Sequence, residues 1–208
     1  MHPDDLDFAL NPEAVASRGQ EKQVKNLPDT RLSRALDNLV LAVNNRVAWL
    51  WALLMAIIIL NVVMRYALGE GRVEFEELQW HLYSIGWLIG LSYCYIADEH
   101  VRVDLFYERF SLKARCWIEL LGTLFLLLPF AVVVIYYTGP FIAYSFELGE
   151  VSAAPGGLPY RWLIKSVLLL GFVFLMLAVI ARLSRVIAYL LNPKTVQPTV
   201  SEGAPDGN

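Results

Sequence analysis

The sequence predicts an all-α integral membrane protein with four transmembrane helices. Of the 208 residues, 57% are apolar and only 18% are charged, whereas a soluble domain is about half apolar and a quarter charged. The uncharged residues are also contiguous, since no Asp, Glu, Lys or Arg occurs in residues 47–64, 78–97, 120–146 and 166–181. A 20-residue helix rises about 30 Å, which matches the hydrocarbon core of a bilayer.

We expect one membrane domain, residues 29–192, with spans at about 47–68, 78–97, 117–138 and 162–184. Residues 1–28 have the composition of a disordered tail, and residues 193–208 predict a mobile C-terminal tail. The N-terminus has no early apolar core, so the first span is retained and not cleaved as a signal peptide. Thirteen basic residues lie on the side of the termini and four on the other side. The positive-inside rule therefore places both termini in the cytoplasm.

A helix is expected to begin after Asp29 or Thr30, either of which can cap it. The apolar residues that follow recur at helical spacing and alternate with charged ones: Leu32, Leu36, Leu39, Val40 and Val43. This pattern favours an N-terminal amphipathic helix in the headgroup layer. An elongated first span is the alternative.

The later elements carry their own signals. Gly86 and Gly90 give the second span a small-residue spacing that suits helix packing. A short interfacial helix is predicted between spans 2 and 3, followed by a helix that Ser111 caps. Pro129 should kink the third span, and Gly139-Pro140 should end or bend it. The segment GEVSAAPGGLPYR, which begins at Gly149, predicts an ordered turn.

Several activities are disfavoured by what the spans contain. An ion-coupled transporter keeps an ionisable group near the bilayer midplane, and the centres of these spans have none. His81 and His100 are separated by about 28 Å along a helix, so they cannot share one haem. Cys94 and Cys116 form no metal or disulfide pattern. We therefore expect no enzyme activity, no cofactor, no metal site and no nucleic-acid partner.

The segment ADEHVRVD, residues 97–104, concentrates titratable residues between two apolar stretches. It could be a proton relay, a metal site, or a charged hinge that docks on a partner. Asp98 and Glu99 follow the second span, where the helix dipole disfavours anions. They therefore need compensating partners, which Arg102, Arg109 or a second protein could supply.

Residues 61–106 resemble the small membrane subunit of TRAP transporters, the DctQ-like family. The matching features are Arg65-Tyr66 at the end of the first span, Glu76-Glu77 at the start of the second, and the HVRVD run from His100 to Asp104. Residues 149–172 resemble a loop and fourth-span entry of the longer members. The resemblance covers about residues 30–192.

The resemblance implies a tripartite uptake system in a prokaryotic inner membrane. A periplasmic binding protein would capture an organic acid, and a large sodium-coupled multi-span subunit would move it. The chain would brace the large subunit and contact membrane lipids. The residues expected to dock partners are Arg65, Glu76, Glu77, His100, Arg102, Asp104, Gly157, Pro159, Arg161 and Lys165. The alternative is a homo-oligomeric scaffold or assembly protein that associates through Gly86 and Gly90 and has no transport activity.

Overall fold

The computed structural model describes residues 27–98 and 110–192. The helices in these ranges are α3 (Arg31–Val47), α4 (Trp49–Ala67), α5 (Val73–Ala97), α7 (Leu112–Gly122), the π-helical segment η1 (Thr123–Leu127), α8 (Leu128–Glu147) and α9 (Arg161–Leu191), and no strand occurs there. The predicted interfacial helix, with His100, Arg102 and Asp104, lies outside the described residues. So do the predicted tails, apart from residues 27 and 28.

Three continuous helical rods in the described residues are long and apolar enough to cross a membrane. They are Arg31–Ala67, Leu112–Glu147 and Arg161–Leu191, with 37, 36 and 31 residues. The remaining predicted span, the second at residues 78–97, corresponds to α5, which has 25 residues. This helix is long enough to cross but less apolar than the others, because tryptophan, tyrosine and serine residues are spread along it.

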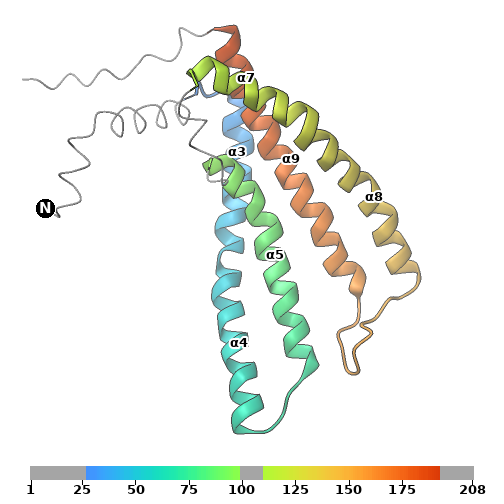
Figure 1. Ribbon diagram of the computed structural model, residues 1–208. Helices are drawn as coiled ribbons and strands as arrows, with labels where there is room; N and C mark the ends of the chain where they lie inside the picture. Colours follow the sequence, from blue (N-terminus) through green and yellow to red (C-terminus); the bar gives the residue numbers. More distant parts are fainter. Residues whose placement is uncertain (1–26, 99–109, 193–208) are drawn as a thin grey trace, which may run out of the picture.

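The rods form an elongated bundle with two distinct ends (Figure 1). The α4–α5 turn and the α8–α9 loop lie together at one end, which we call the hairpin end. Helix α3 begins at the opposite end, where α5 and α9 finish and α7 starts; we call this the termini end. Helix α9 packs against α5, α8 and α3, so it is the central helix of the bundle.

Helix α3 begins where the sequence predicts, because Thr30 caps it. The Thr30 hydroxyl accepts from the Ser33 amide at 3.0 Å, and the Ser33 hydroxyl accepts from the Thr30 amide at 3.1 Å. This reciprocal pair satisfies backbone donors that a helix start leaves open. The predicted cap at Ser111 is also present, since its hydroxyl accepts from the Ala114 amide.

The face of α3 that packs inward is largely polar. Leu32 and Leu39, which the amphipathic pattern assigns to the apolar face, are about half exposed. The buried residues of this helix are instead Ser33, Asp37, Val40 and Asn44. The difference arises because α3 continues the line of α4 and packs against α9 and α5 through polar contacts. The headgroup location of α3 stays a prediction.

The third rod contains the irregularity that its proline predicts. Pro129 has no N–H, and the helix widens into η1 just before it, where the Leu128 amide donates to the Thr123 carbonyl. The rod does not end at Gly139-Pro140, which was one of the two expected outcomes, but continues through Pro140 to Glu147. Neighbouring helices allow a membrane helix to tolerate such a break in its hydrogen bonding.

Helices α5 and α9 lie close together at Gly171. A Cβ atom added to Gly171 would lie 2.8 Å from Leu88 Cβ and 3.1 Å from its carbonyl oxygen. Leu88 also belongs to the main apolar core with Ala131, Phe172, Leu175 and Val179. A side chain at residue 171 would therefore separate two helices that share a core.

We predict that Gly171→Ala destabilises the protein by roughly 1–3 kcal/mol, because overpacking forces backbone shifts. Thermal unfolding in detergent or nanodiscs measures the loss. Gly122→Ala is the matched control, since a Cβ there meets no atom within 4 Å, and it should be neutral or stabilising. Equal midpoints for the two variants would contradict the close approach.

Candidate functional site

The charged side chains of the described helices gather into two groups, one at each end of the bundle. The termini-end group centres on Arg182 of α9, whose residue exposure is only 4%. The hairpin-end group centres on Glu77 at the start of α5. Arg182 and Lys165, which mark these two ends on α9, are separated by about 26 Å of helix rise.

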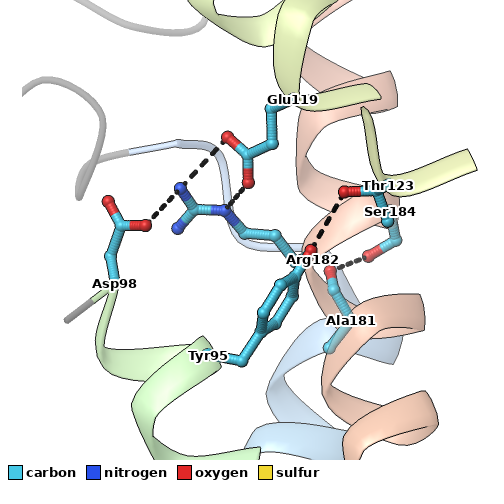
Figure 2. A network of polar contacts seen from close by, with 7 residues as sticks. All are labelled: Tyr95, Asp98, Glu119, Thr123, Ala181, Arg182 and Ser184. Atoms are coloured by element: carbon cyan, nitrogen blue, oxygen red, sulfur yellow. Dashed lines mark hydrogen bonds and ion pairs between the residues drawn. The ribbon is translucent and has the colours of Figure 1, made fainter. Parts of the chain in front are cut away.

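Arg182 joins three helices through its guanidinium group (Figure 2). Its Nε donates to Glu119 Oε1 of α7 at 2.5 Å, and its Nη2 donates to Glu119 Oε2 at 3.2 Å. The same Nη2 lies 3.3 Å from Asp98 Oδ1 at the end of α5. A two-pronged pair of this kind is strong and fixes the orientation of both partners.

Asp98 is one of the two anions at the end of the second span that are expected to need a compensating partner, and the structure provides one. It ends α5 in the left-handed conformation, with φ 60°, and its side chain is only 10% exposed. Aspartate tolerates this conformation better than most residues. Among the described residues, Asp98 pairs with Arg182, which lies 84 positions further along the chain. The expected partners Arg102 and Arg109 lie outside the described residues. From sequence alone, a long cationic side chain such as Arg182 at the end of an apolar block is expected to extend to the membrane interface, which gives no sign of this pairing.

A second arginine fixes α3 to α9 one turn further on. Arg185 forms an ion pair with Asp37 of α3, and its Nε lies 3.7 Å from Asp29 Oδ1. Beside it, the hydroxyls of Thr30 and Ser184 are 2.9 Å apart. The polar inward face of α3 therefore has its partners on α9.

Two neutral hydrogen bonds extend the termini-end group toward the membrane interior. Tyr95 of α5 and Thr123 of η1 have their hydroxyl oxygens 3.1 Å apart (Figure 2). Asn44 donates to the Ser92 hydroxyl at 3.1 Å. Buried polar groups require such partners, because an unpaired one costs free energy in an apolar environment.

At the hairpin end, Glu77 holds the α8–α9 loop. Its carboxylate accepts from the Ser152 hydroxyl, and from the Leu158 amide at 2.6 Å. The guanidinium of Arg161 lies 3.9 Å away. The hydrogen bond from Ser152, followed by that from Leu158, lowers the pKa of Glu77 below its ordinary value. The carboxylate is therefore charged at neutral pH and available to the loop.

The loop needs a residue without a side chain at Gly157. A Cβ atom there would lie 2.4 Å from Ser152 Cβ and 2.9 Å from Glu77 Oε1. Glu150 adds a second connection, through ion pairing with Lys165 of α9, and the hydrogen bond from Lys165 is the main reason that the pKa of Glu150 is lowered. The loop is thus attached to both α5 and α9.

The structure brings most of the predicted docking residues together at the hairpin end. Arg65 pairs with Glu76 across the α4–α5 turn, and the other members at this end are Glu77, Gly157, Pro159, Arg161 and Lys165. Lys165 makes a second contact here, because its Nζ lies 4.0 Å from the centre of the Phe141 ring. His100, Arg102 and Asp104 belong to the residues that are not described.

Gly86 and Gly90 have different surroundings. A Cβ on Gly86 would lie 3.0 Å from the Trp51 ring of α4, whereas one on Gly90 would meet no atom within 4 Å. Both glycines line a groove of about 280 Å³, whose other lining residues are Asn44, Asn45, Val47, Ala48, Trp51 and Tyr93. The groove opens beside the junction of α3 and α4.

The contacts of the two charge groups hold helices and a loop in place. Within residues 27–98 and 110–192, no group of three His, Cys, Asp or Glu residues could hold a metal ion. The His81 ring lies 2.6 Å from the Glu77 backbone carbonyl, while the Glu77 carboxylate is engaged with the loop. Those two side chains therefore serve separate contacts.

A family model for the DctQ component of tripartite ATP-independent periplasmic transporters matches residues 54–188. The match covers more than half of the chain and includes Glu77, Asp98, Glu119 and Arg182. No curated protein matches the chain.

We predict that Arg182→Leu destabilises the protein by roughly 3–5 kcal/mol, because it removes the buried cation that two largely buried carboxylates share. The triple variant Arg182→Leu/Glu119→Leu/Asp98→Asn should recover much of this loss, since no unpaired charge remains. Thermal unfolding of both variants measures the difference.

Arg72→Ala is the control for loss of an arginine, because Arg72 and Glu70 form an exposed pair at 3.7 Å. It should cost less than about 1 kcal/mol. A small effect of Arg182→Leu, equal to that of Arg72→Ala, would show that the buried network does not stabilise the bundle.

Proposed function

The chain belongs to the DctQ family of tripartite ATP-independent periplasmic transporters, and we propose that it is the small permease subunit of such a transporter. In this proposal it braces a large multi-span subunit during uptake of an organic acid, which a periplasmic binding protein delivers. Sodium coupling and substrate recognition are assigned to those two partners and to no residue of this chain.

The observation that carries the proposal is the distribution of charge along the described helices. The ion pairs lie at the two ends, and the uncharged blocks between them hold no Asp, Glu, Lys or Arg. A transporter that couples an ion by itself needs an ionisable group near the midplane. A membrane subunit that uses its charges to hold its own helices together is suited to a bracing role.

We propose that α5 also crosses the membrane, as the second of four spans. Glu77 and Asp98 bound its uncharged segment, and their separation corresponds to about 32 Å of helix. Glu77 belongs to the hairpin-end charge group and Asp98 to the termini-end charge group. Helix α5 therefore runs from one charge group to the other, like the three more apolar rods. Helix α5 lies between α4 and α9, and two of its polar residues, Ser92 and Tyr95, make hydrogen bonds to Asn44 of α3 and Thr123 of η1.

We propose that the membrane is the prokaryotic inner membrane, with the termini end in the cytoplasm, because the positive charge is concentrated there. The rod Arg31–Ala67 is about 55 Å long, so α3 must extend beyond the hydrocarbon core. Exposed Leu32 and Leu39 beside exposed Arg31 and Arg34 would suit contact of this extension with lipid headgroups.

The surfaces that would contact the large subunit follow from the same proposal. His100, Arg102 and Asp104 are proposed as a docking and anchoring segment on the cytoplasmic side. The Gly90 side of the groove described above is proposed as a helix-packing surface, since no atom of the described residues lies within 4 Å of a Cβ position on Gly90.

We expect opposite sidedness for the two ends of α5. Single cysteines replace Gly71, in the α4–α5 turn, and Lys113, at the start of α7, in a chain without Cys94 and Cys116. A membrane-impermeant maleimide should label residue 71 in intact spheroplasts, but residue 113 only after permeabilisation. Labelling of both residues from the same side would contradict a crossing by α5.

We expect that the tagged chain, purified from its native membrane in mild detergent, retains a much larger multi-span protein identified by mass spectrometry. Arg102→Ala/Asp104→Ala should reduce that recovery several-fold. The control is Glu70→Ala/Arg72→Ala, which removes an exposed ion pair from the hairpin end. Recovery of the chain alone, as a homo-oligomer, would overturn the subunit proposal in favour of a scaffold.

A further inference from the structure

Tyr160 has a backbone conformation that its side chain disfavours. This residue immediately precedes α9, with φ 63° and ψ 47°. Left-handed backbone is costly for a bulky L-residue, and glycine would adopt it without strain. Such strain persists where the surrounding contacts determine the conformation, and it is concentrated at functional sites.

The Tyr160 side chain is not buried in return for this strain. It is 63% exposed, so the ring is directed away from the packed helices. Exposed aromatic residues on a rigid support are frequent anchors at protein interfaces, because they bury a large area with little loss of side-chain entropy.

The loop that carries Tyr160 is rigid. The Arg161 amide donates to the Glu150 carbonyl at 3.1 Å, the Ser152 amide to the Leu158 carbonyl at 3.2 Å, and the Gly157 amide to the Ala154 carbonyl at 2.9 Å. The carboxylate of Glu77 adds its contacts to Ser152 and Leu158. These contacts hold the backbone of the loop, and so the point from which the Tyr160 side chain projects, in place before any partner arrives.

The surface around this loop is acidic. The two segments 65–77 and 147–165 together contain six glutamates and four basic residues. Each basic residue has a carboxylate partner in this part of the structure. Glu74 and Glu147 are therefore in excess, and both are exposed. Glu74 lies at the loop itself, since its Oε1 is 3.7 Å from a Cβ position on Gly156.

We propose that Tyr160 is the anchor of a docking surface for a soluble protein with a basic patch. Its partner in the transporter is the substrate-binding component, so this inference rests on the proposed function. The excess charge of Glu74 and Glu147 attracts the basic patch and increases the association rate. The Tyr160 ring enters an apolar recess of the partner and slows dissociation.

The test uses the intact membrane complex in nanodiscs and the purified binding component, with the dissociation constant measured by biolayer interferometry at two salt concentrations. Tyr160→Gly and Tyr160→Asn relieve the backbone strain, so their thermal midpoints should be no lower than that of the wild type. Their dissociation constants should rise about tenfold or more, the scale of an aromatic anchor. Tyr160→Phe keeps the ring and should stay within about threefold of the wild type.

Glu74→Gln/Glu147→Gln should weaken binding modestly and reduce its salt dependence. Phe110→Ala removes an exposed aromatic residue from the opposite end of the bundle and should change nothing. Binding of the wild type together with unchanged binding of Tyr160→Gly and Tyr160→Asn would overturn the anchor and leave the subunit proposal standing. Absence of both the large subunit and wild-type binding would overturn the proposed function and this inference with it.

Discussion

The bundle depends on a guanidinium group buried where three helices meet. Removing the charge of Arg182 from water is costly, and the cost is recovered only if carboxylates are placed around it with good geometry. Glu119 provides two oxygens and Asp98 a third. Because these partners come from α7 and α5, satisfying one side chain of α9 sets the relative position of three helices.

The same helix also determines how closely the others approach. Gly171 lets the backbone of α9 contact Leu88 of α5, and Arg185 draws the polar face of α3 inward through Asp37. In a membrane, lipid tails compete with apolar side chains for helix surfaces. Close packing and polar contacts therefore hold helices together there. Helix α9 supplies both, which accounts for its central position.

The two charged ends differ in a way that bears on function. At the termini end, Arg182 and Asp37 are buried, and their ion pairs join helices to one another. At the hairpin end they are more exposed, and Glu77 and Glu150 hold a loop against α5 and α9. The charges of this DctQ-family chain therefore connect its own helices at one end and hold a loop at the other.

Much of this molecule is determined by local sequence. The uncharged segments place the helices, and Thr30, Ser111 and Pro129 mark two starts and one irregularity, because capping and the missing proline N–H act within a few residues. The sequence motifs also indicate the family, and they contain many of the site residues, which lie near the ends of the spans. The pairing of charges is different, since Asp98 and Arg182 are 84 positions apart, and nothing in their spacing selects one arginine over another. The inward polar face of α3, the contact at Gly171 and the left-handed backbone of Tyr160 likewise follow from how the helices pack. Tertiary structure decides them because each depends on which surfaces meet, and that is a property of the whole bundle.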